Sequence, residues 1–171
     1  MDMIQLGKNA KAAASIMNRL GTRQKNLGLL KAADYLVDET PAILSANEKD
    51  VEYARSEGMK EPMIDRLRLT AERILAMAEG LRQVADLEDP VGEVLSMKTR
   101  PNGLIIGQKR VPFGVIGIIY ESRPNVTADA FGLCFKSGNA AILKGGSDAI
   151  HSNEAIVSAI RRALAESDLP E

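Results

Sequence analysis

The sequence VIGIIYESRPNVTADAFGLCFKSGNAAILKGGS, residues 115–147, decides the fold. Two apolar runs, residues 115–120 and 140–143, flank an amphipathic segment that Gly138 ends. This order of patterns predicts one βαβ unit. The first run has almost no polar alternation, which predicts a parallel strand covered on both faces. Ligands of such sheets bind at the carboxyl ends of the strands, so the sequences after the two runs, ESRPN and KGGS, form the candidate site.

The first half of the chain has apolar residues at helical spacing. Threonine and glycine residues mark the expected starts and ends of these helices. We expect Thr22, Thr40 and Thr70 to cap helices, with Pro41 as the first helical residue after Thr40, and Gly58 to end that helix. Residues 1–88 are therefore predicted to form a helical layer with short connections.

The pattern changes to that of a β-hairpin over residues 89–111. Residues 91–99 and 104–111 have the character of extended segments, and the Asn102-Gly103 dipeptide between them favours a tight hairpin turn. The second arm is apolar at its start. It would leave an edge that another element or another chain has to cover.

Residues 112–171 are predicted to contain the first βαβ unit and one following helix. Asn125 is expected to cap the first helix of this part, and Ser147 or Asp148 the last one. The sequence ends where the third strand of a doubly wound sheet is expected, because two parallel strands do not form a stable open sheet. We therefore interpret the chain as the front part of a larger protein.

Composition excludes several classes of function. The 171 residues carry a net charge of −1, which gives no overall attraction to nucleic acid or to a membrane surface. Aromatic residues make up 4% and tryptophan is absent, which leaves little for stacking on bases. No apolar run approaches the about 18 residues of a membrane span. A single cysteine precludes an internal disulfide and suits the cytoplasm.

The KGGS turn offers a positive charge, two glycines and the start of a helix at a strand end. Glycines let a ligand approach the backbone, and free N–H groups attract anions, so a nucleotide ribose or phosphate fits. A plain turn explains the same residues equally well. The sequence contains neither a P-loop nor a GxGxxG motif. Arg123 also has two interpretations. It can bind a phosphate or carboxylate through two hydrogen bonds, or it can form a surface ion pair with Glu121. The spacing slightly favours the ion pair.

The single cysteine and the single histidine do not form a catalytic set. Cys134 lies on the apolar stripe of its helix, which favours a buried core cysteine over a nucleophile. His151 lies in the first turn of the last helix with no acidic cluster near it in sequence, and is interpreted as a surface residue. No triad or metal site is expected.

Two long stretches resemble one family. PFGVIGIIYESRPNVT and FKSGNAAILKGGSDAIHSN strongly resemble the gamma-glutamyl phosphate reductases of the aldehyde dehydrogenase superfamily. LSANEKDVEYAR, MIDRLRLT and VADLEDPVGEVL are similar to the same family. The resemblance implies an α/β fold in which residues 1–171 are the N-terminal part of a Rossmann-like NADP-binding domain, without the catalytic domain. It also implies NADPH-dependent reduction of L-glutamate 5-phosphate to the 5-semialdehyde in cytoplasmic proline biosynthesis.

The resemblance assigns a cofactor side to the candidate site. Lys144 matches a lysine that contacts the adenosine ribose. Ser147 stands where many NAD-preferring members have a glutamate, and the loss of that carboxylate favours NADPH, whose 2′-phosphate Lys144 would attract. The remaining cofactor-binding candidates, from the same turn and the strand-end loop, are Tyr120, Glu121, Ser122, Gly145 and Gly146.

The resemblance also assigns a substrate side. Arg123 falls near an oxyanion-hole asparagine of ordinary aldehyde dehydrogenases and suits the phosphate of the substrate, and Asn125 is the second substrate-binding candidate. The catalytic cysteine of the family lies further downstream, and Cys134 does not match its motif. We therefore expect no catalytic residue in this chain and no reductase activity from it alone. The alternative is a non-catalytic nucleotide-binding or oligomerisation module, in which residues 91–111 join copies into a homo-oligomer.

Overall fold

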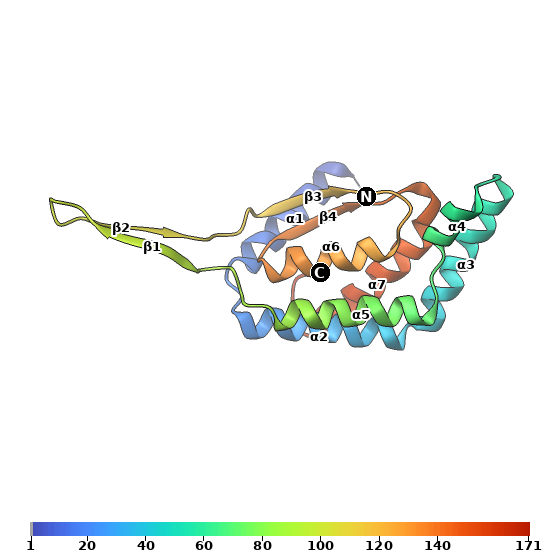
Figure 1. Ribbon diagram of the computed structural model, residues 1–171, viewed down its shortest axis with the longest axis horizontal. Helices are drawn as coiled ribbons and strands as arrows, with labels where there is room; N and C mark the ends of the chain where they lie inside the picture. The colour runs from blue at the N-terminus through green and yellow to red at the C-terminus, as the bar shows by residue number, and fades with distance from the viewer. Residues whose placement is uncertain (1) are drawn as a thin grey trace.

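The computed structural model describes residues 2–171 (Figure 1). Its helices and strands follow one another in the order α1 (Met3–Met17), α2 (Thr22–Asp38), α3 (Thr40–Ser56), α4 (Glu61–Leu67), α5 (Ala71–Asp86), β1 (Val94–Thr99), β2 (Ile105–Lys109), β3 (Val115–Ile119), α6 (Asn125–Lys136), β4 (Ala140–Lys144) and α7 (Ile150–Glu166). A 3₁₀ turn, Ser147–Ala149, joins β4 to α7.

Helix boundaries in the first half follow the signals in the sequence. The Thr70 hydroxyl accepts a hydrogen bond from the backbone N–H of Arg73 at 3.2 Å, which confirms Thr70 as a cap. Thr40 is the first residue of α3 rather than its cap, because Glu39 occupies the cap position. Gly58 follows the end of α3 with φ of 75°, a conformation that glycine adopts without steric cost. Thr22 is the first residue of α2 rather than its cap, because Gly21 occupies the cap position.

Two predicted caps in the second half are wrong. Asn125 is the first residue of α6, and Pro124 holds the cap position. Neither Ser147 nor Asp148 caps α7, because both residues lie in the 3₁₀ turn that precedes it. A carboxylate from another element, described below, binds the first N–H groups of α7 instead.

The main hydrophobic core lies where α2, α5, α6 and α7 meet. α2 packs along both α5 and α7, and α5 packs against α6 (Figure 1). Apolar side chains that are almost fully buried fill the interface, among them Leu29, Leu36, Ile74, Leu81 and Ile156. α1 lies apart from this group and packs against β4 and, to a smaller extent, β3. The helices thereby hold the β3–α6–β4 unit in a fixed position.

The strands form two separate pairs. β1 and β2 are antiparallel and extend away from the body as a ribbon, which confirms the predicted hairpin (Figure 1). Its apolar side chains are largely uncovered, with Met97 62% and Ile105 59% exposed. β3 and β4 are parallel, in register from Val115 opposite Ala140 to Ile119 opposite Lys144, as the βαβ prediction required.

The prediction that the first strand is covered on both faces is wrong for the part of the chain that the structure describes. Alternate residues of β3 are exposed, and Ile119 is 82% exposed. The reason is that α1 and α6 both pack against β4, whereas β3 receives only a smaller contact from α1. A continuous apolar run gives a strand two apolar faces. Within residues 2–171, only one face of β3 is covered.

Candidate functional site

The carboxyl ends of β3 and β4 lie side by side. Ile119 is the partner of Lys144 in the parallel register, and the N–H of Tyr120 donates to the carbonyl oxygen of Lys144 at 3.1 Å. The segments that follow the two strands, residues 120–123 and residues 145–147, therefore start from the same edge of the sheet. This is the convergence that the βαβ pattern predicts.

The two segments are in close contact with each other. The Ser122 hydroxyl donates to the Asp148 carboxylate at 2.7 Å, which ties the first segment to the 3₁₀ turn. A Cβ atom on Gly146 would lie 3.5 Å from the backbone of Glu121 and Ser122. A Cβ atom on Gly145 would clash with the side-chain amide of Asn153. Packing therefore requires a glycine at position 145, whereas at position 146 a Cβ atom would make only ordinary contact.

A chain of hydrogen bonds fixes the base of the site. The Tyr120 hydroxyl lies 2.6 Å from the Thr127 hydroxyl, and Thr127 donates in turn to the Asn153 side-chain oxygen at 2.9 Å. Thr127 is fully buried. These bonds join the end of β3 to α6 and α7, so the tyrosine ring has a defined position under the turn after β4.

Opposite charges flank the turn after β4. Lys144 is exposed and, among residues 2–171, has no carboxylate within 4.0 Å. The half-buried Asp148 carboxylate accepts hydrogen bonds from Ser122 and, at 3.4 Å, from Ser147. Sequence reasoning considered Asp148 only as a cap. Its contact with Ser122 gave no signal in the sequence, because the two residues lie in separate loops.

The Asp50 carboxylate of α3 supplies the missing cap of α7. It is buried and accepts hydrogen bonds from the His151 and Ser152 N–H groups at 3.2 and 2.8 Å. It also lies 2.7 Å from His151 Nδ1 and 2.5 Å from the Ser152 hydroxyl. The His151 side chain is 53% exposed at the surface as expected, and a single carboxylate, that of Asp50, lies beside it. Asp50 is distant in sequence and carries no motif that would reveal this contact.

Cys134 is a core residue. It is 4% exposed, and burial raises the pKa of its thiol, which opposes formation of a thiolate. Its side chain borders an apolar cavity of about 270 Å³ between α1, α6, β4 and α7. None of the candidate site residues lines that cavity.

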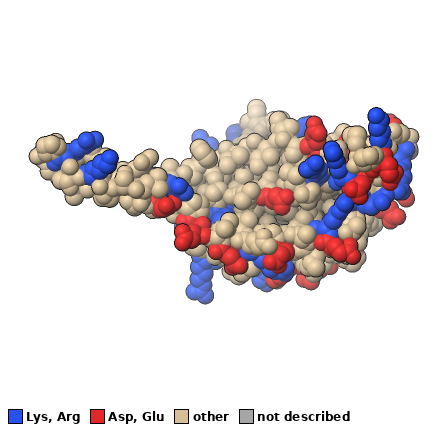
Figure 2. All heavy atoms as spheres, viewed as in Figure 1, with Lys and Arg blue, Asp and Glu red and all other residues tan. Residues whose placement is uncertain are grey.

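Arg123 and Asn125 border a different cavity, of about 380 Å³, between α4, α5 and the start of α6. Figure 2 shows basic and acidic side chains interspersed at this end of the molecule. Arg123 does not form the surface ion pair with Glu121, since no carboxylate of residues 2–171 lies within 4.0 Å of it. The charged and polar residues that line the cavity are Asp65, Arg66, Arg68, Arg73, Arg123, Asn125 and Asp129.

No helix within residues 2–171 combines the length and the hydropathy needed to cross a membrane.

Comparison with known proteins gives a family. No protein-family model matches the chain. The gamma-glutamyl phosphate reductase of Lachnospira eligens is 57% identical over 165 residues, which cover 96% of this chain and 40% of the relative. The crystal structure of the gamma-glutamyl phosphate reductase of Thermotoga maritima is 47% identical and matches with a TM-score of 0.96, over 99% of this chain and 41% of that one.

More distant structures show the same fold. A salicylaldehyde dehydrogenase from Pseudomonas putida G7 is 20% identical and matches with a TM-score of 0.72, over 94% of this chain and 31% of that one. This likeness confirms the predicted α/β class and the aldehyde dehydrogenase fold. The chain spans about two fifths of the length of the curated relatives that it matches. With 54–58% identity over nearly all of its length to those relatives, the chain belongs to the gamma-glutamyl phosphate reductase family.

Proposed function

We propose that the chain is the cofactor-binding part of an oxidoreductase that reduces L-glutamate 5-phosphate to L-glutamate 5-semialdehyde with NADPH, in proline biosynthesis. The observation that carries this proposal is the pair of adjoining loops at the ends of β3 and β4. One loop presents Lys144 to solvent and the other presents Arg123, and neither side chain has a carboxylate partner within residues 2–171. The names of the relatives support the reaction.

The residues at the end of β4 fit an adenine dinucleotide that carries a 2′-phosphate. Lys144 supplies an unpaired positive charge, and Ser147 places a hydroxyl at the start of the 3₁₀ turn. Asp148, the nearest carboxylate in sequence, is bound to Ser122. Gly145 and Gly146 leave the backbone of the turn accessible. NADPH would supply the hydride, and these residues would hold its adenosine end.

The loop after β3 provides the substrate side. Tyr120, Glu121 and Ser122 would lie along the cofactor, and Arg123 and Asn125 would contact the acyl phosphate. Cys134 cannot serve as the nucleophile, because it is buried and its thiol pKa is raised. A reaction through a cysteine thioester would therefore need a thiol from outside residues 1–171, and we assign no catalytic residue within them.

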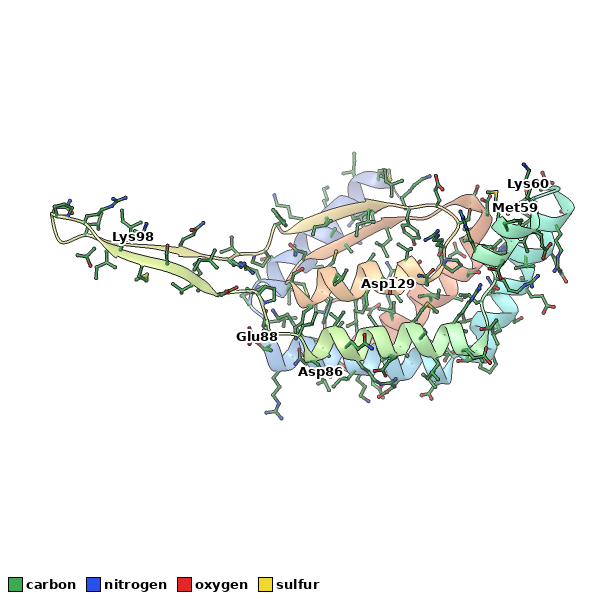
Figure 3. The ribbon with its side chains drawn as sticks, viewed as in Figure 1. Met59, Lys60, Asp86, Glu88, Lys98 and Asp129 are labelled. Carbon is green, nitrogen blue, oxygen red and sulfur yellow. The ribbon has the colours of Figure 1, made fainter. Side chains whose placement is uncertain are left out.

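Replacing Lys144 tests the cofactor assignment. Lys144→Ala is expected to weaken NADPH binding to the chain several-fold, because it removes the charge that faces the 2′-phosphate, and to weaken NADH binding less. Isothermal titration calorimetry with both nucleotides measures the effect. Lys98→Ala is the matched control, since Figure 3 places Lys98 on the distant hairpin. Equal NADPH affinity in the Lys144 and Lys98 variants would reject the assignment.

A further inference from the structure

The cavity between α4, α5 and α6 is lined by several charged side chains, of which the proposed function assigns only Arg123 to the substrate. It brings together side chains from α4 and α5, which are consecutive in the sequence, and from the start of α6, which lies about 40 residues further along the chain. We call it the arginine–aspartate cavity and define it by Arg66, Arg73, Arg123 and Asp129. Its volume of about 380 Å³ falls within the range of small-molecule sites.

Some of these charges are already satisfied by the protein. One Arg73 nitrogen donates to the carbonyl oxygens of Asp65 and Arg68 at 2.5 and 2.6 Å. The other nitrogen lies 3.2 Å from the Asp65 carboxylate. Arg68 pairs with Glu61 at 3.6 Å. Arg73 and Asp65 therefore form a wall of the cavity, and their charges compensate each other.

Three charges remain. Among residues 2–171, Arg66 and Arg123 have no carboxylate within 4.0 Å, and Asp129 has no basic side chain within that distance. The nearest hydrogen-bond donor to Asp129 is the Asn125 side-chain amide at 3.3 Å. The cavity thus presents two positive charges and one negative charge, all on exposed residues, that have no ion-pair partner within residues 2–171.

Asp129 is an exposed residue, but packing against α5 removes part of the water around its carboxylate. Figure 3 shows it on α6, and a Cβ atom on Gly80 of α5 would lie 4.0 Å from its carboxylate oxygen. Desolvation by this packing raises the pKa of Asp129, and the bond from Asn125 offsets only part of the effect. A bound cation would stabilise this carboxylate more than it would stabilise one in open water.

We propose that the arginine–aspartate cavity binds the α-amino-acid head group of the substrate. Asp129 accepts hydrogen bonds from the ammonium group, Arg66 pairs with the α-carboxylate, and Arg123 remains for the phosphate at the other end. An inorganic anion or a nucleotide phosphate would use the arginines but would be repelled by Asp129. An amino acid that ends in an acyl phosphate carries one positive and two negative groups, which match the three unpaired side chains. This inference rests on the proposed function and adds Arg66 and Asp129 to the site.

A stable analogue allows the head group to be tested in the 171-residue chain. L-2-amino-6-phosphonohexanoate keeps the amino acid and replaces the labile acyl phosphate by a phosphonate, and 6-phosphonohexanoate lacks the amino group. Calorimetric titration of both compounds gives the contribution of the ammonium group as a ratio of affinities. We expect the amino compound to bind about tenfold more tightly to the parent chain, as one charge-assisted hydrogen-bonded pair would provide.

Substitutions in the cavity then show which residue provides the contribution of the ammonium group to binding. Asp129→Asn is expected to abolish the preference for the amino compound and to leave 6-phosphonohexanoate binding unchanged or stronger. Arg66→Gln is expected to weaken both compounds several-fold. Glu88→Gln and Arg23→Gln, at exposed positions outside the cavity, are the matched controls and should bind like the parent.

The proposal is overturned if the parent chain does not bind the amino compound, or if Asp129→Asn keeps the full preference for it. Titration with NADPH separates this failure from a failure of the proposed function. Normal NADPH binding with an unchanged amino preference in Asp129→Asn would reject only the head-group site. Head-group binding without any NADPH binding would reject the cofactor assignment.

Discussion

Gly145 and Gly146 stand next to each other in the turn after β4, but their surroundings differ. A Cβ atom at position 145 would clash with the Asn153 amide and lie 3.2 Å from the Tyr120 ring. At position 146 it would lie 3.5 Å from the neighbouring backbone, which is ordinary contact. Asn153 cannot simply rotate away, because its side-chain oxygen accepts the hydrogen bond from Thr127.

This difference predicts that alanine destabilises the protein at position 145 but is tolerated at position 146. Gly145→Ala should lower the free energy of unfolding by about 1–3 kcal/mol, because overpacking displaces the network under the turn. Gly146→Ala should change it by less than about 0.5 kcal/mol or stabilise slightly, since alanine restricts the unfolded chain. Urea denaturation followed by circular dichroism measures both. Equal effects would show that the contacts around Gly145 do not constrain the turn.

Some residues of the candidate site could be predicted from the sequence, and others could not. Lys144 and Arg123 could be proposed from the sequence because ligands bind at the carboxyl ends of the strands, where both cations lie. Asn153 and Asp50 were not, because they act through partners on other elements. Arg66 and Asp129 look like ordinary surface charges in the sequence. Only the packing of α4, α5 and α6 brings them to one cavity.

At the scale of elements, the segment that leads from α5 into the hairpin is held by a buried ion pair. Asp89 accepts hydrogen bonds from Lys25 and Thr22 of α2 at 2.6 and 2.7 Å, and from the Val91 N–H at 3.0 Å. Lys25 is 1% exposed. Burial by itself would raise the pKa of Asp89, but the hydrogen bonds, led by the one from Lys25, together hold that pKa below its usual range.

We call Asp89 and its partners Lys25 and Thr22 the Asp89 clamp, and it predicts a pH dependence of stability. The unfolded pKa of an aspartate is about 3.9, and the folded pKa of Asp89 is lower. The ionised clamp therefore stabilises the fold above about pH 4 and loses that contribution as the pH falls through the folded pKa. Asp89→Asn should cost about 3 kcal/mol near pH 7, because it leaves Lys25 buried without its partner, and should flatten the decline below about pH 4.

Thermal unfolding of the parent and the variant between about pH 2.5 and pH 7 provides the measurement. Asp86→Asn, at an exposed position just before the same segment (Figure 3), is the control and should follow the parent curve. Parallel pH profiles for the Asp89 variant and the parent would contradict the role assigned to the clamp.

The elements themselves were largely predictable. Helical spacing, the Asn102-Gly103 turn and the apolar runs gave the helices, the hairpin and the parallel pair, because each depends on local sequence. Caps were less predictable. Asn125 has the right side chain for a cap but lies one residue too late, and the cap of α7 comes from α3. A local pattern contains no information about a partner on a distant element.

At the scale of the whole molecule, the two cavities described above differ in character. The apolar cavity beside α1 is lined by none of the proposed cofactor residues, and the arginine–aspartate cavity holds the proposed substrate residues. The adjoining loops after β3 and β4 lie at the end of β3 and β4 that leads toward α4 (Figure 1). In the proposed function, Arg123 would lie between the cofactor loops and the arginine–aspartate cavity.

The central claim is that these two loops bind NADPH. A titration of the isotopically labelled chain with NADPH, followed by amide ¹H–¹⁵N nuclear magnetic resonance, tests it residue by residue and detects weak binding. We predict saturable shifts centred on residues 120–123 and residues 144–147, with the hairpin unaffected. Shifts confined to the apolar cavity beside α1, or no shifts at any accessible concentration, would contradict the account.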